Sequence, residues 1–114
     1  MEHQLELMPD DWQRMLAVVA HPDDLEYGAA SAVAGWTSAG KWVGYVIVTD
    51  GEAGIDGLPP NEAGPVRVAE QEHSARIVGV DDVRFLGYPD GVVEPAVELR
   101  RDIAREIRRA RPDV

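Results

Sequence analysis

The chain has 114 residues, 45% of them hydrophobic and 28% charged, which is typical of one small globular domain built around a single core. Its formal net charge of −10 argues against nucleic acid and membrane surfaces as partners. Cysteine is absent from the sequence, so disulfides are excluded and a metal ion would need imidazole and carboxylate ligands. Residues 1–10 do not resemble a signal peptide, and we expect a cytoplasmic protein.

The first half of the chain is predicted to form a strand, a helix and a second strand. The continuous apolar run 15–20 is typical of a strand buried on both faces, and it ends at His21-Pro22. Two aspartates follow, and they suit the start of a helix. The alanine-rich segment 28–39 predicts that helix. Segment 42–49, rich in β-branched and aromatic residues, predicts the second buried strand.

The second half of the chain is predicted to alternate in the same way. Segment 50–64 is rich in glycine and proline and predicts a long loop of the kind that is usually functional. We expect Pro65 to open a helix that ends at Gly79, because proline is well tolerated in the first turn of a helix. A short strand is predicted over 83–86, and apolar residues at helical spacing predict a last helix over 96–110.

This alternation predicts an α/β fold, a Rossmann-like parallel sheet with helices on both faces. We assign residues 1–14 to an N-terminal extension and residues 15–114 to the folded domain. Residues 113–114 read as the entry into another strand, so we expect this chain to be the N-terminal part of a larger fold.

Three polar clusters follow the predicted strands, at 21–24, 50–54 and 88–91. Ligands of open α/β sheets bind beyond the carboxyl ends of the strands, so these clusters are expected to converge there. His21 and Asp24 are three residues apart across a turn and can face a common point, where imidazole and carboxylate suit Zn²⁺ or a similar divalent ion. Asp23 lies between them, and its carboxylate could take a proton from a water that attacks a carbonyl.

Each of these residues also has a purely structural interpretation. Asp23 and Asp24 could cap the following helix while His21 is an ordinary loop residue. Asp50 and Glu52 lie among glycines, where acidic residues often serve turns.

The other two histidines are weaker candidates for metal ligands. His73 falls four residues after Ala69 and four before Ile77, so we place it on the inward face of its helix as a packed residue. His3 is expected to be solvated.

Four blocks of the sequence, in order, resemble the LmbE/PIG-L family of zinc-dependent N-deacetylases. The blocks are Ala-His-Pro-Asp-Asp at 20–24, Val-Thr-Asp-Gly-Glu-Ala-Gly at 48–54, Arg67 with Glu70 and Ala75, and Phe-Leu-Gly-Tyr-Pro-Asp-Gly at 85–91. They spread over 16–114, and four ordered blocks are a specific signal where one would be weak.

The resemblance implies a metal-dependent hydrolase that removes an acetyl group from an N-acetylated amino sugar or a related acetamide. By the same resemblance, His21 and Asp24 would be ligands of Zn²⁺, for which Fe²⁺ or Co²⁺ could stand in, and Asp23 would be the general base. Arg67 and Asp90 would hold polar groups of the substrate. The partner would thus be a small glycoconjugate, and the sequence leaves room for a homo-oligomer.

Two features depart from the family pattern. Leu25 directly follows the second aspartate, where many members have a glutamate, and Glu26 comes one residue later. The family's third metal ligand is a histidine in a later block, which has no counterpart before Val114. We therefore expect residues 1–114 alone to bind Zn²⁺ weakly and to be nearly inactive.

Three other interpretations are compatible with parts of the sequence. One is a deacetylase-like domain that is incomplete or non-catalytic. A Rossmann-type nucleotide-binding module is disfavoured because the Gly-x-Gly-x-x-Gly turn is missing after the first strand. A receiver-like domain that binds Mg²⁺ through clustered aspartates would leave His21-Pro22 without a role.

Overall fold

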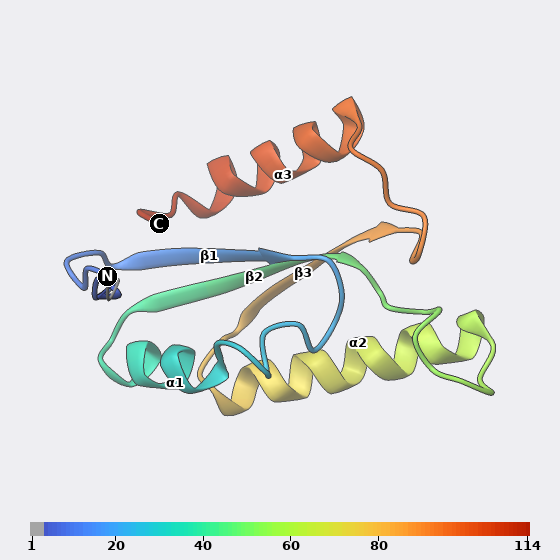
Figure 1. Cartoon of the computed structure of the whole chain (residues 1–114), viewed down its shortest axis with the longest axis horizontal. Coiled ribbons are helices and arrows are strands. Elements are labelled where there is room, and N and C mark those ends of the chain that lie inside the picture. Colours follow the sequence, from blue (N-terminus) through green and yellow to red (C-terminus); the bar gives the residue numbers. More distant parts are fainter. Residues whose placement is uncertain (1–3) are drawn as a thin grey trace.

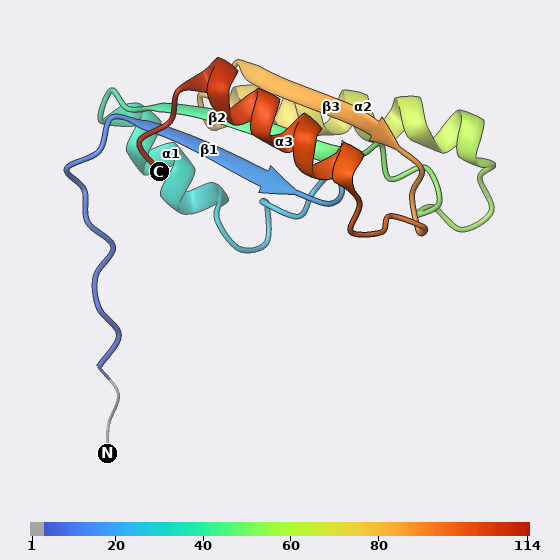
Figure 2. The same cartoon turned by 90° about the horizontal axis from the view of Figure 1, so that it is seen from above.

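Three parallel strands form the centre of the molecule, in the order β1-β2-β3, in a computed structural model that describes residues 4–114. The strands are β1 (Arg14–Val19), β2 (Trp42–Thr49) and β3 (Asp82–Tyr88). The helices are α1 (Ala30–Ser38), α2 (Pro60–Ile77) and α3 (Val97–Ala110). Helices α1 and α2 lie on one face of the sheet and α3 lies on the other (Figure 1), and the view from above shows α3 lying over the strands (Figure 2). The predicted parallel α/β architecture is confirmed.

The central strand β2 is buried along nearly its whole length, because it has a strand on either side and helices above and below. Every residue from Val43 to Thr49 is buried. One face of β2 packs into the main core with residues from α1, α2 and their flanking loops, a cluster made of Val43, Tyr45, Ile47, Leu25, Val33, Ala75 and Val80. A strand covered on both faces needs apolar residues at successive positions, and this explains the unbroken run in the sequence.

The parallel register brings the carboxyl ends of the three strands to one edge. Strand β1 pairs with β2 from Arg14 opposite Trp42 to Val19 opposite Ile47. Strand β3 pairs with the other side of β2 as far as Tyr88 opposite Thr49, with a register shift just before that pair. The chain therefore leaves all three strands at the same edge of the sheet.

Helix α2 begins at Pro60, and the prediction that Pro65 opens it was wrong. Pro60 occupies the first turn together with Glu62, and both residue types favour a helix N-terminus. Pro65 lies inside the helix, about one turn later. Because proline has no backbone N–H, the helix loses only the hydrogen bond to the carbonyl of Asn61, which is an exposed residue. The predicted long loop is accordingly shorter and ends at Pro59.

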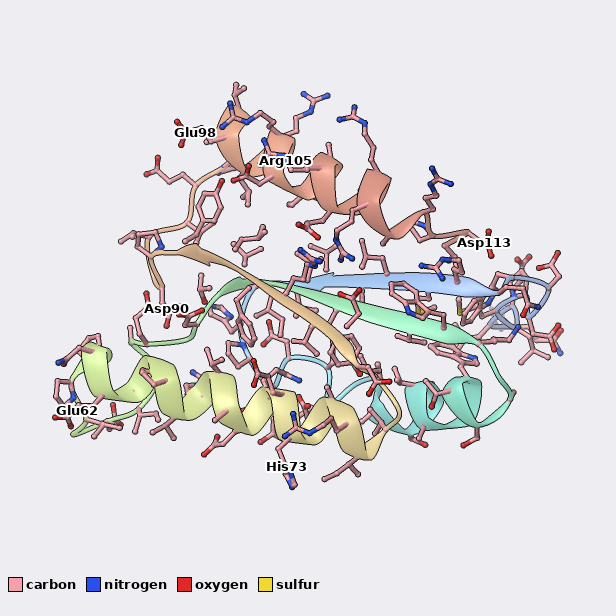
Figure 3. All side chains as sticks on the ribbon, turned by 180° about the vertical axis from the view of Figure 1, so that it is seen from behind. Glu62, His73, Asp90, Glu98, Arg105 and Asp113 are labelled. Carbon is pink, nitrogen blue, oxygen red and sulfur yellow. The ribbon has the colours of Figure 1, made fainter. Side chains whose placement is uncertain are left out.

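His73 is exposed, so its predicted place on the inward face of α2 was also wrong. Figure 3 shows it pointing away from the sheet. The buried residues of α2 are Ala63, Gly64, Gln71 and Ala75. This inner row carries a polar residue at Gln71, whereas the outer row contains Ile77, which is 72% exposed. Reading the apolar residues alone therefore selected the wrong face.

Polar contacts fasten α3 to the edge strand β3. The Arg109 guanidinium donates to both oxygens of Asp82, at 2.9 and 3.2 Å. The Tyr88 hydroxyl donates to Asp102 at 2.5 Å, and this bond raises the pKa of Tyr88 to about 12. These contacts fix the position at which the chain leaves β3. Within residues 4–114, no helix has the length and apolar character needed to cross a membrane.

Residues 113–114 lie along the free edge of β1 and hydrogen-bond to its backbone. The backbone N–H of Val114 donates to Arg14 at 3.2 Å, and the N–H of Leu16 donates back to Val114 at 3.0 Å. The Asp113 carboxylate accepts the N–H groups of Gln13 and Arg14, at 2.8 and 3.0 Å. These two bonds hold the pKa of Asp113 below its ordinary value.

Replacing Asp113 with asparagine is expected to lower the melting temperature at neutral pH and to change it little in acid. The folded-state pKa lies below the unfolded one, so the stabilisation is complete above the unfolded value of about 4 and is lost as the pH falls through the folded value. Thermal denaturation of both proteins at pH 7 and below pH 3 tests this. A difference between them that persists in acid would contradict it.

Candidate metal and substrate site

Three loops meet at the carboxyl edge of the sheet, as the sequence predicted from topology. They follow β1, β2 and β3, and we refer to them as the first loop (20–29), the second loop (50–59) and the third loop (89–96). The Thr49 backbone N–H and hydroxyl both donate to the carbonyl of Ala20, at 3.0 Å each, which joins the starts of the first two loops.

Asp90 ties the third loop to the other two. One of its carboxylate oxygens lies 3.1 Å from Nε2 of His21, and the other accepts the backbone N–H of Ala53 at 3.0 Å. The Asp90 side chain is only 7% exposed. In Figure 3 it lies between the end of β3 and the segment that precedes α2. Both carboxylate oxygens are thus engaged by the protein itself.

His21 and Asp24 present their donor atoms to one another. Nδ1 of His21 lies 3.6 Å from Oδ2 of Asp24, and the two side chains are 45% and 41% exposed. A tetrahedral ion with bonds of about 2.0–2.2 Å to nitrogen and oxygen would hold its donors about 3.4 Å apart. The donor types, their spacing and their access to solvent therefore fit two ligands of one divalent ion.

Asp24 and Asp23 do not cap helix α1, although a capping role was one interpretation of the sequence. The N-cap of α1 is Ala29, without a side-chain hydrogen bond, and the preceding residues form turns. Asp24 instead accepts the backbone N–H of His21 at 2.9 Å, which closes a turn around the two predicted ligands.

Asp23 adopts an unusual backbone conformation between the predicted ligands. Its φ angle is +72°, in the left-handed region that L-residues seldom occupy. Its backbone N–H donates to Oε1 of Gln71 at 2.7 Å. Burial raises the pKa of Asp23, with a further contribution from Glu26, while Arg67 opposes the shift. A carboxylate with a raised pKa suits a group that accepts a proton near neutral pH.

Arg67 binds the first and second loops together from the inner face of α2. Its guanidinium donates to the carbonyl oxygens of Pro22 and Gly51, at 3.0 and 3.1 Å, and lies 3.8 Å from the Asp23 carboxylate. The second loop leaves room for it because residue 54 is glycine. A Cβ on Gly54 would lie 2.0 Å from Nη1 of Arg67.

Glu52 supports the third loop from the second. Its Oε1 accepts the backbone N–H of Asp90 at 2.7 Å, while its Oε2 is buried without a hydrogen-bond partner among the described residues. Burial and the neighbouring Glu52 raise the pKa of Asp50. The contacts therefore give Glu52 an anchoring role, which the sequence alone left open.

Sequence reasoning missed Gln71 and the group around it. The Gln71 side chain is fully buried and also donates to Glu26 at 3.2 Å, and Ser74 donates to the same carboxylate. The sequence did contain a clue to this role. Gln71 falls one turn after Arg67 on α2, so the two side chains lie on the same face of the helix.

Residues 4–114 contain no group of three or more histidine, cysteine or acidic side chains arranged to hold one metal ion. His21 and Asp24 form a pair, Asp90 lies on the far nitrogen of the imidazole, and His73 lies on another surface. His3 falls outside the described residues.

Residues 16–114 match the PIG-L family, described as GlcNAc-PI de-N-acetylase. The chain belongs to the PIG-L family. The matched segment starts where the sequence resemblance does and includes all three loops of the site.

Individual PIG-L relatives support this assignment. The chain is 32% identical over 107 residues to a diacetylchitobiose deacetylase of Thermococcus kodakarensis, covering 92% of this chain and 40% of the relative. An N,N′-diacetylchitobiose deacetylase structure from Pyrococcus horikoshii superposes with a TM-score of 0.86 at 32% identity, over 90% of this chain and 39% of that one. The chain thus spans about two fifths of the length of these relatives.

The fold is shared with an enzyme of another kind. A 4-carboxy-2-hydroxymuconate hydratase from Pseudomonas putida KT2440 has a TM-score of 0.79 and 23% identity, over 88% of this chain and 44% of that one. At this identity the likeness concerns the fold alone, so the chemistry must be argued from the site.

Proposed function

We propose that the protein is a metal-dependent hydrolase that removes the acetyl group from an N-acetylated amino sugar or a related acetamide. The observation that carries the proposal is the facing pair of His21 Nδ1 and Asp24 Oδ2, 3.6 Å apart, with the Asp23 carboxyl between them in the chain. Membership of the PIG-L family and relatives named as deacetylases of diacetylchitobiose support the substrate class.

His21 and Asp24 would hold the metal ion, and Zn²⁺, Fe²⁺ or Co²⁺ suits a site of imidazole and carboxylate donors. A divalent ion supplies Lewis-acid chemistry: it activates water and polarises a carbonyl. Asp90 would fix the imidazole so that Nδ1 faces Asp24, because its carboxylate holds the opposite ring nitrogen. This orienting task is additional to the substrate contact that the sequence suggested for Asp90, which stays a proposal.

Asp23 would act as the general base. Its carboxylate would take the proton from the attacking water and later deliver it to the departing amine nitrogen. Arg67 would hold Asp23 in place through the first loop. The contact with polar groups of the substrate that the resemblance implied for Arg67 stays a proposal. The same loops, rather than the sheet, would select among acetylated sugars.

The direct test is the identification of products from an N-acetylglucosaminide. In a form of the protein that includes the family's later histidine block, we expect metal loading to give acetate and a free amine in equal amounts, and chelation to stop this release until Zn²⁺ is added back. Residues 1–114 alone should release little acetate. Release that continues unchanged after chelation would contradict a metal-dependent reaction. If that longer form is loaded with metal and still releases no acetate, an incomplete or non-catalytic domain is favoured.

The position of Arg67 gives a second prediction, because it depends on a glycine. Gly54→Ala should lower kcat/KM nearly as much as Arg67→Ala, by about 10- to 100-fold, since its Cβ would displace the guanidinium from both loops. Gly28→Ala is the matched control, because a Cβ there meets no atom within 4 Å. Steady-state kinetics of the three variants provide the measurement. Equal rates in Gly54→Ala and Gly28→Ala would show that this contact is unimportant.

A further inference from the structure

Gln71 is a polar side chain with no exposure to solvent, and both ends of its amide are bonded within the site. Its Oε1 accepts the backbone N–H of Asp23 at 2.7 Å, and its Nε2 donates to Oε1 of Glu26 at 3.2 Å. The first partner is a donor and the second an acceptor, so the amide can take only one orientation. Ser74 also donates to Glu26 and thereby fixes the far end of the chain of bonds.

The position of Gln71 in the core would ordinarily favour an apolar residue. A buried amide needs partners for its donors and its acceptor, whereas leucine fills a similar volume without any such requirement. Gln71 neighbours Ala75 on the inner row of α2, where apolar packing is available. Its polarity is therefore explained by what it bonds, which is the main chain of the first loop.

The hydrogen bond from the Asp23 backbone N–H to Gln71 lies at a residue with a strained backbone conformation. The φ angle of Asp23 is +72°, and its N–H has no other hydrogen-bond partner among residues 4–114. Fixing that N–H fixes the peptide plane between Pro22 and Asp23. The plane and the φ angle together set the direction of the Cα–Cβ bond, and so the place of the carboxyl group.

We propose that Gln71 is a positioning residue for Asp23, acting through the Asp23 main chain and held in its own orientation by Glu26. The proposal rests on the proposed function, in which Asp23 accepts the proton. The hydrogen bonds of the Gln71 side chain go to Asp23 and Glu26 and to neither predicted metal ligand, so its loss should misplace the base while leaving the ion in place.

Gln71→Leu should lower kcat by about 10- to 100-fold with little change in KM and with unchanged metal content. Val33→Ala is the matched control, because Val33 is 1% exposed in the hydrophobic core and its apolar side chain makes no hydrogen bond to the site. It should lower the melting temperature with little effect on kcat. A Gln71→Leu variant with wild-type kcat, or one that loses metal and activity in proportion, would overturn the proposal.

Exchanging the side chains of residues 71 and 26 distinguishes a loss of positioning from simple misfolding. Gln71→Glu alone places two carboxylates together and should lower kcat strongly. The double variant Gln71→Glu/Glu26→Gln again pairs one carboxylate with one amide. Residue 71 still accepts the Asp23 N–H, and the bond between residues 71 and 26 is reversed, because residue 26 now donates to residue 71. We expect the double variant to recover most of the lost kcat. No recovery would argue that the side-chain acceptor at residue 71 is not what positions Asp23.

Amide hydrogen exchange in the 114-residue chain tests the contact without any need for activity. The Asp23 amide should exchange slowly in the wild type and in the double variant, and much faster in Gln71→Leu, while the His21 amide, bonded to Asp24, stays protected. If this pattern is found and a form with the family's later histidine block still shows no deacetylation, the proposed function is refuted while the contact stands. Equal Asp23 exchange in wild type and Gln71→Leu would overturn the positioning role.

Discussion

Replacing Asp23 with asparagine is expected to lower kcat by about 10²- to 10⁴-fold and to leave the metal content of the protein unchanged. Asparagine keeps the size of the side chain and can keep the backbone bond to Gln71, but it cannot accept a proton. Acetate release and elemental analysis of the same sample provide the two readouts. A loss of metal equal to that of an Asp24 variant would contradict the separate roles given to the two aspartates.

His21→Ala and Asp24→Ala are each expected to remove the metal ion, with a fall in affinity of several orders of magnitude. Each removes one of two facing donors, and a catalytic zinc site usually has three protein ligands, so little coordination would remain. Asp90→Asn should have a smaller effect, about 10- to 100-fold, because it weakens only the bond that orients His21. Calorimetric titration with Zn²⁺ measures all three affinities.

Asp56→Ala supplies the control for these titrations, since Asp56 is an exposed acid of the second loop with no place in the proposed site. Its affinity should equal that of the wild type. If His21→Ala and Asp24→Ala also bind Zn²⁺ as the wild type does, the ion is held elsewhere and the assignment of ligands is wrong.

The sheet could be predicted well from the sequence because its strands have a strong local signal. Segments 15–20 and 42–49 are rich in apolar residues, and the alternation with helices implies parallel pairing. Burial on both faces was correct for β2 but wrong for the edge strand β1, where Val18 is 38% exposed. The start of α2 could not be decided in the same way. Pro60 and Pro65 both satisfy the rule for a helix start, and the choice depends on contacts that the sequence does not display.

The inner face of α2 was misjudged because that face carries polar residues bonded to a loop. A helix that packs on a core usually shows apolar residues inward, and this rule placed His73 inside. The helix instead turns Arg67 and Gln71 toward the first loop, because the strained turn at Asp23 needs donors and an acceptor from a neighbouring element. Local rules of amphipathicity fail where the inward face of a helix hydrogen-bonds a loop instead of packing on apolar residues.

The meeting of the three loops followed from topology, but the bonds within the site did not. That the carboxyl ends of parallel strands share an edge was enough to bring 21–24, 50–54 and 88–91 together. It could not show that Asp90 holds the far nitrogen of His21, or that Arg67 is engaged by two carbonyl oxygens. Those contacts depend on side-chain directions that arise only when the whole sheet is assembled.

The most direct test of the metal site is anomalous diffraction at the zinc absorption edge, from crystals of the protein grown with Zn²⁺. We predict one strong peak at the first loop, within bonding distance of His21 Nδ1 and an Asp24 carboxylate oxygen, with Asp90 still on His21 Nε2. A peak bonded to other residues, with the His21 and Asp24 pair left free of metal, would contradict the assignment of these two side chains as the ligands.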